Sequence, residues 1–389
     1  MQGGSLIRRA ARGAGGHHRT ARAVVGIGIV LVMSGCGAVG APPKSGAGSP
    51  SAPAGTSAHP SQTSSAAPPT PTPAPTPTPP AADLMAYAAT MDGNVVPVDV
   101  TAGRAEARIP ADLQPEAIAI TPNGRTAYVA DAFAATVTPI DLATGFAGTA
   151  MSVTFTPHSG ISAIAISPGG ATAYVAVVVA AQATGLVVPI DLANGTPEAA
   201  IPVGSDPVAI AITPDGSTAY VVDYGDGTLT PIALASDSVE PQILVGGNPI
   251  AMAITPDGHA AYVMDGLDAN AVIPIALAAD PAQDVVGGAI SGVSGEAEAI
   301  AIAPDGSRAV LVGGTGASLI SLPSGAQLGA TISGSFTCVA ISPDGATALL
   351  GFFDGTGGTK GVLPVKLSGG ASGAPIILAG EPAAIAIRP

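Results

Sequence analysis

The sequence predicts an all-β protein, a seven-bladed β-propeller with four-stranded blades, and two observations support this. A phrase of three parts recurs along the chain: A-I-A-I, then Thr/Ser-Pro-Asp-Gly, then A-Y-V. The prolines of its turns are separated by 46, 46, 42, 48 and 39 residues, and they are Pro122, Pro168, Pro214, Pro256, Pro304 and Pro343. A period of about 40 residues, with short apolar strands and no helical signal, is typical of a β-propeller.

Each repeat divides into four predicted strands. A-I-A-I is the first strand, and its alternation of small and large side chains lets neighbouring sheets interdigitate. In the turn that follows, Pro presets φ, Asp bonds back to the backbone and Gly accepts a positive φ. A-Y-V is the second strand. The third strand is V-x-P-I-D-L, as at residues 137–142, and its proline indicates interrupted pairing with a more variable fourth strand, as at 199–204.

The two ends of the repeat region predict how the ring closes. Residues 86–88 and 95–100 match a second and a third strand, whereas residues 382–389 match a first strand followed by a seventh repeat proline. The chain therefore carries seven first strands and seven second strands. We expect the C-terminal strand to complete the blade that residues 84–110 begin, because such closure removes exposed sheet edges.

The repeats resemble the YVTN family of β-propeller repeats, whose pattern runs P-x-x-I-A-I-T-P-D-G-x-x-A-Y-V-T-N-x-x-x-x-T-V-x-V-I-D. The resemblance covers about residues 84–389 and implies the architecture. The family's T-N after A-Y-V is replaced here by pairs that end in Asp: Ala130-Asp131, Val222-Asp223 and Met264-Asp265. Members of the family include cell-surface and secreted proteins, and related propellers include lactonases and quinoprotein dehydrogenases. The resemblance therefore implies no particular reaction.

Residues 1–35 are predicted to be a lipoprotein signal peptide. Five arginines precede an apolar run at 23–33 that is too short to span a membrane. Residues 33–37, Met-Ser-Gly-Cys-Gly, resemble the bacterial lipobox, which implies cleavage before Cys36 and lipidation of its thiol. The alternative is an ordinary signal peptide with an incidental cysteine. The Arg8-Arg9 pair hints at twin-arginine export, but the apolar residues of that motif do not follow it.

Residues 36–82 are predicted to start with lipidated Cys36 and to continue as a disordered stalk of Pro, Ala, Ser, Thr and Gly. Such a segment has almost nothing to bury and cannot offset the entropy of ordering. We expect the protein to be exported. We also expect its propeller, residues 83–389, to be a monomer. The lipid would anchor it to the membrane, at the outer face of the bacterial cytoplasmic membrane or at the cell surface.

The net negative charge of the repeat region limits the kinds of partner that it can bind. All 27 acidic residues lie at or after Asp83, where they are accompanied by seven basic residues, so this region has a net charge of −20. A surface that negative repels nucleic acid and anionic lipid, and nucleic acid is not an expected partner. The charge favours cations or basic ligands, or else it keeps a very apolar protein soluble.

Few residues of the repeat region are suited to catalysis. Its two histidines, His158 and His259, fall in loops that are expected on opposite faces of a propeller. His and Cys show no metal-ligand spacing, and no G-x-S-x-G elbow occurs. Cys338 falls at the first position of a first strand, where a buried thiol packs like Ala. The glycine-rich stretches 223–227 and 355–361 lack the full features of calcium or phosphate loops, and tight turns explain both.

One set of carboxylates remains as a candidate ligand face. Loops between second and third strands are expected to share a propeller face with loops between fourth and first strands. That face would gather Asp131, Asp223, Asp226, Asp265, Asp268, Asp354, Glu116, Asp206, Glu296, Glu298 and Glu381. The Asp after A-Y-V recurs in three blades, so these carboxylates would ring the mouth of the central channel. One interpretation is a site for Ca²⁺ or a basic ligand, and the other is that the loops of an acidic protein are simply acidic.

The sequence thus favours a surface-anchored lipoprotein with a non-catalytic propeller, which binds a protein or cell-envelope ligand through a loop face and needs no cofactor. The alternative is a propeller enzyme of the lactonase or quinoprotein-like kind that uses a carboxylate-bound metal. The scarcity of His and the absence of Trp argue against that alternative. A third interpretation is a structural component of the cell envelope with no discrete ligand.

Overall fold

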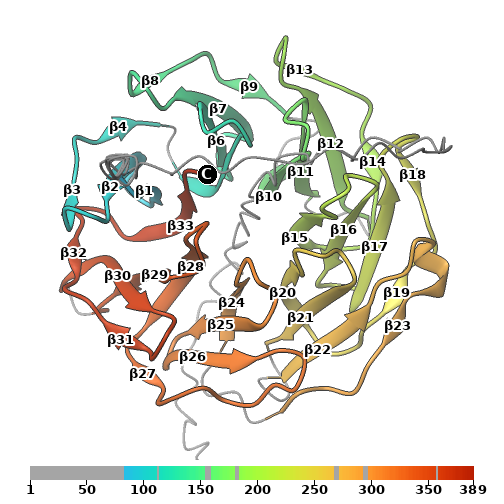
Figure 1. The fold of residues 1–389 in the computed structure, drawn as a ribbon. Coiled ribbons are helices and arrows are strands. Elements are labelled where there is room, and N and C mark those ends of the chain that lie inside the picture. Colours follow the sequence, from blue (N-terminus) through green and yellow to red (C-terminus); the bar gives the residue numbers. More distant parts are fainter. Residues whose placement is uncertain are drawn as a thin grey trace, which may run out of the picture. The chain divides into compact units, whose positions relative to one another are not determined.

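The computed structural model describes residues 83–111, 114–153, 159–179, 184–266, 271–291, 297–355 and 358–389. These residues form seven antiparallel sheets arranged in a ring (Figure 1), which confirms the predicted seven-bladed propeller. Their only helix is a short 3-10 turn, η1 (Pro281–Gln283), and no helix within these ranges is long and apolar enough to cross a membrane. The predicted leader, Cys36 and the stalk lie outside the described residues.

The strands occur in the predicted order from the ring axis outward. The innermost strands are β33 (Pro382–Ile387), β5 (Pro115–Ile120), β10 (Ser159–Ile166), β15 (Pro207–Ile212), β20 (Pro249–Ile254), β24 (Ala297–Ile302) and β28 (Phe336–Ile341). The second strands are β1 (Met85–Thr90), β6 (Thr126–Asp131), β11 (Thr172–Val179), β16 (Thr218–Asp223), β21 (Ala260–Asp265), β25 (Arg308–Gly313) and β29 (Thr347–Phe353). The third strands are β2 (Asn94–Asp99), β7 (Thr136–Asp141), β12 (Leu186–Asp191), β17 (Thr228–Ala233), β22 (Ala271–Ala276), β26 (Gly316–Ser321) and β30 (Lys360–Lys366). Blades are numbered 1 to 7 in the chain order of their second strands, so blade 1 contains β1 and blade 7 contains β29.

The outermost strand differs from the expectation, because in most blades it is broken into two short pieces. The pieces are β3 (Arg104–Ala105) and β4 (Ile109–Pro110), β8 (Phe146–Ala147) and β9 (Met151–Ser152), β13 (Thr196–Pro197) and β14 (Ile201–Pro202), β18 (Ser238–Val239) and β19 (Ile243–Leu244), β23 (Val285–Val286), β27 (Ile332–Ser333), and β31 (Ala371–Ser372) and β32 (Ile376–Ile377). The fourth strand predicted at 199–204 is therefore wrong in extent. The cause is the third-strand proline: Pro189 has no N–H to donate, and its carbonyl accepts a single bond of 2.8 Å from the Glu198 amide between the two pieces.

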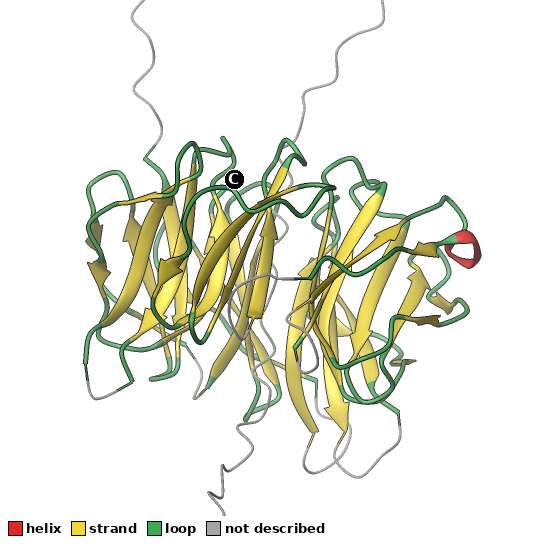
Figure 2. Ribbon diagram, turned by 90° about the horizontal axis from the view of Figure 1, so that it is seen from below, coloured by secondary structure: helices red, strands yellow, loops and turns green. Residues whose placement is uncertain are grey.

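The ring closes through its two ends, as predicted. β33 pairs antiparallel with β1, so that Ala86 lies opposite Ile387 and Ala88 opposite Ile385. The innermost strands contact one another from blade to blade, and β33 lies between β28 and β5. The last residue, Pro389, fills the place of a repeat proline, since a Cβ added to Gly124 of the next turn would lie 3.6 Å from its Cδ. Figure 2 shows the blades from the side, with the C-terminus at one of the two loop faces.

The repeated residues form the core and the turns. The five repeat tyrosines are buried, and each lies opposite a third-strand proline, as Tyr220 does opposite Pro231. In the turn after β15, the Thr213 hydroxyl donates to Asp215 at 2.6 Å, and Gly216 adopts a φ of 72°. A Cβ added to Gly216 would lie 3.4 Å from the ring of Pro168, the turn proline of the preceding blade. The Pro-Asp-Gly phrase therefore shapes one turn and packs it against the next.

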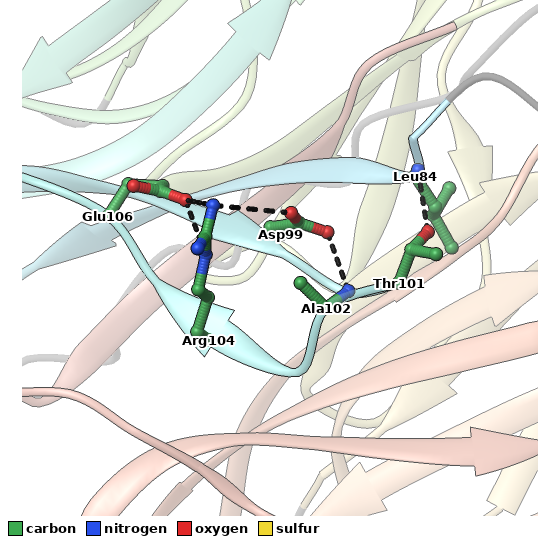
Figure 3. Close-up of polar contacts among 6 residues, drawn as sticks. All are labelled: Leu84, Asp99, Thr101, Ala102, Arg104 and Glu106. Carbon is green, nitrogen blue, oxygen red and sulfur yellow. Dashed lines mark hydrogen bonds and ion pairs between the residues drawn. The ribbon is translucent and has the colours of Figure 1, made fainter.

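The aspartate at the end of the third strand is also a turn residue. Figure 3 shows the turn of blade 1, where the Asp99 carboxylate accepts a bond of 2.8 Å from the Ala102 amide. Arg104 lies across this turn, donating to Glu106 at 2.9 Å and lying 3.9 Å from Asp99 (Figure 3). The same bonding recurs at Asp141, which accepts from the Thr144 amide at 2.8 Å. These carboxylates are occupied by the turns that connect the third strand with the outermost strand.

Candidate ligand face

The loops between second and third strands and the loops between outermost and innermost strands lie side by side. We call the surface they form the loop face. Backbone hydrogen bonds join the two kinds of loop: Ala132 N–H to Gln114 O, Tyr224 N–H to Asp206 O, Gly266 N–H to Asn248 O and Met91 N–H to Glu381 O, at 2.9–3.1 Å. Each bond is donated by the residue directly after a second strand. The described candidate carboxylates in these joined loops therefore belong to one face of the propeller.

The aspartates that follow A-Y-V are not presented at the surface of this face. Asp131 is fully buried, and its carboxylate accepts bonds from the amides of Phe133 (2.9 Å) and Ala134 (2.6 Å) and from the amide of Gln114. Asp265 is 8% exposed and accepts a bond of 3.2 Å from the Asn248 amide. Because each carboxylate holds the loops of its own blade, the expectation that these residues ring the mouth of the channel needs correction. They lie one strand away from the innermost strands.

Asp223 occupies the same repeat position in blade 4 but has different surroundings. Its side chain is fully buried, and its Oδ2 accepts from the Thr230 hydroxyl at 2.5 Å and from the Thr228 hydroxyl at 3.3 Å. Its Oδ1 has no hydrogen-bond partner among the described residues. Burial raises the pKa of Asp223 to about 7, and the charge of Asp226 adds to the rise while the two hydroxyls oppose it.

The exposed carboxylates of the loop face come from the loops themselves. Asp226 and Asp354 lie in loops between second and third strands, and Asp206 lies in a loop that enters an innermost strand. The Asp226 Oδ2 accepts a bond of 2.7 Å from the Ser205 amide, and Asp206 has a φ of 50°, which Asp tolerates better than most residues. Glu381 is half-buried at the entry to β33. These side chains are the ones that a ligand approaching the face would meet.

Glu116 and Glu298 lie deeper, on the innermost strands. Each is the extra residue of a β-bulge, in β5 and β24 respectively. Two other blades place a hydroxyl at the same position: Ser162 donates to the Pro207 carbonyl at 2.5 Å, and Thr337 donates to the Pro382 carbonyl at 2.7 Å. Both bonds reach the next blade. The bulge position is therefore where neighbouring blades are joined around the axis.

The remaining candidates add no group of metal ligands to what the structure describes. Asp268 and Glu296 lie outside the described residues, as does His158. In the described part of the chain no three His, Cys, Asp or Glu side chains are grouped so that they could hold a metal ion, and we assign no metal ligand to this face. His259 is an exposed turn residue, and burial raises the pKa of the Cys338 thiol to about 12. That thiol is a packing group.

Two features of the surface were missed by reasoning from the repeats alone. No Lys or Arg occurs between Arg125 and Arg308, a stretch that carries 18 of the 27 acidic residues. This stretch runs from β6 to the end of blade 5 and into β24, so the acidic residues of these blades have no Lys or Arg in their own segment. A charge profile along the sequence reveals this asymmetry without any structure.

The second feature is a hydrogen bond between blades, from the side chain of Tyr220 to that of Asp284, which no local sequence pattern indicates.

Comparison with known proteins shows the fold and nothing finer. No family model matches the chain, and no curated protein matches it. Among solved structures, the chain is similar to hydrazine synthase of Kuenenia stuttgartiensis, with 20% identity, a TM-score of 0.61 and coverage of 71% of this chain and 90% of that one. It is also similar to a functionally unknown protein of Desulfotomaculum acetoxidans, with 15% identity, a TM-score of 0.65 and coverage of 79% and 99%. Likeness at these identities supports the propeller architecture alone.

Proposed function

We propose that this chain is an exported lipoprotein of the YVTN-like repeat type, whose propeller binds a basic protein or cell-envelope ligand through the loop face without catalysis. Cys36 carries the lipid, and residues 37–82 are the stalk that separates the membrane from the propeller. The stalk has about 46 residues, which in an extended polyproline conformation reach at most on the order of 140 Å.

The observation that carries this proposal is the uncompensated charge of blades 2 to 5. The exposed Asp206 and Asp226 lie on the loop face in the stretch from residue 126 to residue 307, which contains no Lys or Arg. In that stretch the acidic side chains have no Lys or Arg of their own segment to pair with. A field of one sign attracts an oppositely charged partner, raises its association rate and is weakened by salt. A basic ligand is therefore the kind that this face favours.

The buried residues explain why the contacts would come from the loops. Asp131, Asp223 and Asp265 are covered, and the repeated Pro, Asp and Gly residues form turns and blade contacts. Ligand contacts are thus left to the residues that vary between blades. In propellers and other rigid scaffolds, such loops carry recognition while the strands hold them in place.

Cross-linking on intact cells tests the proposal. Cells that express the full chain are treated with a cross-linker, and the proteins joined to it are recovered and compared with those from an Asp206→Asn/Asp226→Asn variant. We expect a basic cross-linked partner whose recovery falls several-fold in the variant and at raised salt. The matched control is Asp257→Asn/Asp305→Asn in the turns between first and second strands, because Asn123 already occupies that turn position in blade 2. Equal recovery from all three proteins, or no specific partner, would contradict the proposal.

A further inference from the structure

Asp223 and Asp131 stand at the same position of the repeat, yet the structure gives their carboxyl groups opposite surroundings. Both side chains are fully buried. Asp131 receives backbone N–H donors on both oxygens, from Gln114 on Oδ2 and from Phe133 and Ala134 on Oδ1. The Asp223 Oδ2 accepts from two hydroxyls, and the nearby Gly204 amide also favours the charged form, whereas its Oδ1 has no partner among the described residues. A buried charge needs such partners, so Asp223 is much less suited than Asp131 to being ionised.

The neighbours of Asp223 cannot easily turn to supply the missing donor. The Thr230 hydroxyl accepts bonds from the Gly204 amide (3.3 Å) and from the Gln242 side chain (3.1 Å), so its own proton is the one given to Asp223. The Gly204 backbone packs directly on the carboxyl, since a Cβ added there would lie 2.4 Å from the Asp223 Cγ. The carboxyl is thus enclosed by groups that are already occupied.

The charged groups around Asp223 are all acidic. Asp226 lies on the loop that follows it, Asp206 lies on the loop that packs over it, and Asp265 holds the equivalent position in blade 5. The strands packed against it carry no titratable side chain; these are β15 and β17 of its own blade and β10 and β20 of the neighbouring blades. No Lys or Arg occurs anywhere from residue 126 to residue 307. The ionised form therefore meets repulsion and finds no cation.

Two loops are held together directly above this carboxyl. The Tyr224 amide donates to the Asp206 carbonyl and the Gly225 amide to the Ser205 carbonyl, both at 3.0 Å. In return the Ser205 amide donates to the Asp226 Oδ2 at 2.7 Å. A Cβ added to Gly225 would lie 2.3 Å from the Ser205 hydroxyl oxygen, so the loops touch closely. Anything that pushes Asp226 away from Asp223 also strains the bond that Asp226 makes to Ser205.

We propose that Asp223 is a pH switch on the loop face: loops 203–206 and 224–227 pack together over its carboxyl while that carboxyl is neutral, and its ionisation loosens them. Loss of the proton creates a buried anion with one bare oxygen beside Asp226. Opening the two loops admits water to that oxygen and increases its distance from Asp226. The pKa of about 7, raised mainly by burial, places this change between mildly acidic and neutral conditions.

Titration of the carboxyl itself tests the first half of the proposal. The full chain is labelled with ¹³C at aspartate side-chain carbons, and the carboxyl shifts are followed by NMR as the pH is raised; the Asp223→Asn variant assigns the Asp223 signal. We expect a midpoint near neutrality, as the pKa of about 7 implies. A midpoint below about 5, close to that of an ordinary aspartate, would overturn the proposal.

Amide exchange tests whether the proton controls the loops. In the full chain, we expect the protection of the Tyr224 and Gly225 amides to fall about tenfold or more, after correction for intrinsic exchange, between about pH 5 and about pH 8. Asp223→Asn is nearly the same shape as the neutral acid and should hold these amides protected at both pH values. Asp131→Asn, the matched control in blade 2, should leave the loss of protection in blade 4 unchanged. The proposal would be overturned if the protection of these two amides stayed constant in the unsubstituted chain, or if Asp223→Asn lost as much protection as the unsubstituted chain does.

Discussion

The hydroxyl of Tyr220 donates a hydrogen bond of 2.7 Å to the Oδ2 of Asp284, and this bond joins blade 4 to blade 5. Tyr220 lies in β16, and Asp284 directly precedes β23 on the outer edge of the next blade. Burial raises the pKa of both groups; Asp284 further raises that of Tyr220, and the bond from Tyr220 opposes the rise at Asp284. Tyr220 thus packs in the core and also forms a hydrogen bond between two blades.

Replacing Tyr220 by Phe should lower the free energy of unfolding by about 1–2 kcal/mol, because it removes the hydrogen bond to the Asp284 Oδ2 and leaves that residue only the bond of 2.7 Å from the Ala278 amide to its Oδ1. Urea denaturation of the full chain measures the loss. The control is Tyr262→Phe at the equivalent position of blade 5, since within the described residues the Tyr262 hydroxyl makes no hydrogen bond. We expect that variant to change the free energy by less than about 0.5 kcal/mol. Equal effects in the two variants would show that the link between the blades contributes nothing.

Removal of residues 382–389 should sharply lower the melting temperature, by more than about 10 °C, or abolish the cooperative transition. The deletion takes away β33, including the buried Ile385 and Ile387, and it opens the ring between β28 and β5. A deletion of residues 388 and 389 alone keeps β33 and serves as the control, with a small expected change. An unchanged melting temperature after the longer deletion would refute closure by the C-terminal strand.

Gly169→Asp should stabilise the protein by about 0.5–1 kcal/mol. Gly169 stands where most blades have the turn aspartate, and a Cβ added there would meet nothing within 4 Å. The new carboxylate would accept the hydroxyl proton of Ser167, as Asp344 accepts that of Ser342 at 2.5 Å. Denaturation of Gly169→Asp and Gly169→Ala separates this bond from the loss of glycine flexibility. A variant with Asp that is no more stable than the one with Ala would contradict the turn bonding.

Stability should be highest in mildly acidic solution. The turn carboxylates Asp215, Asp257, Asp305 and Asp344 have lowered pKa values, because hydroxyl and amide donors of their own turns favour the charged form. Their contribution is present above about pH 4 and is lost as the pH falls through their lowered pKa values. Asp223 acts in the opposite sense: its folded pKa is raised, so its contribution is lost as the pH rises from about 4 towards 7.

A series of thermal melts measures this pH dependence. The Asp223 difference alone, about three pKa units, corresponds to at most about 4 kcal/mol between the two ends of its window. We expect the melting temperature of the full chain to peak between about pH 4 and 6 and to decline on both sides. A maximum above pH 7 would be inconsistent with a buried, uncompensated Asp223.

The architecture was predictable because its determinants are local. Each repeat carries its own turn, as Thr213, Asp215 and Gly216 do, and the same spacing of Pro and Gly packs one turn on the next. Counting strands then correctly assigned the C-terminal strand, residues 382–389, to the blade that residues 84–110 begin, because that blade lacks a first strand and the C-terminus has one left over. The third-strand proline predicted interrupted pairing with the outermost strand. It did not predict that this strand would be divided into two short pieces, because a proline gives no information on their length.

The candidate site was less predictable because burial of a loop carboxylate depends on distant segments. Asp131 and Asp223 follow the same A-Y-V phrase, yet one is met by backbone amides and the other by Thr228 and Thr230. Nothing in the repeat distinguishes them beforehand. Placing the two loop types on one face needed only the topology, whereas deciding which carboxylates reach solvent needed the packed structure. Among the candidates that the structure describes, Asp206, Asp226 and Asp354 are exposed.

The most direct test of the account is to ask which face of the propeller touches a partner on living cells. A photo-cross-linking amino acid is placed at the exposed Phe133 in the loop between β6 and β7 on the loop face, or at Asp257 in a turn of the opposite face, in the full lipid-anchored chain. We predict one specific adduct with a basic partner from position 133 and none from position 257. The same adduct from both positions, or from position 257 alone, would contradict a ligand-binding loop face.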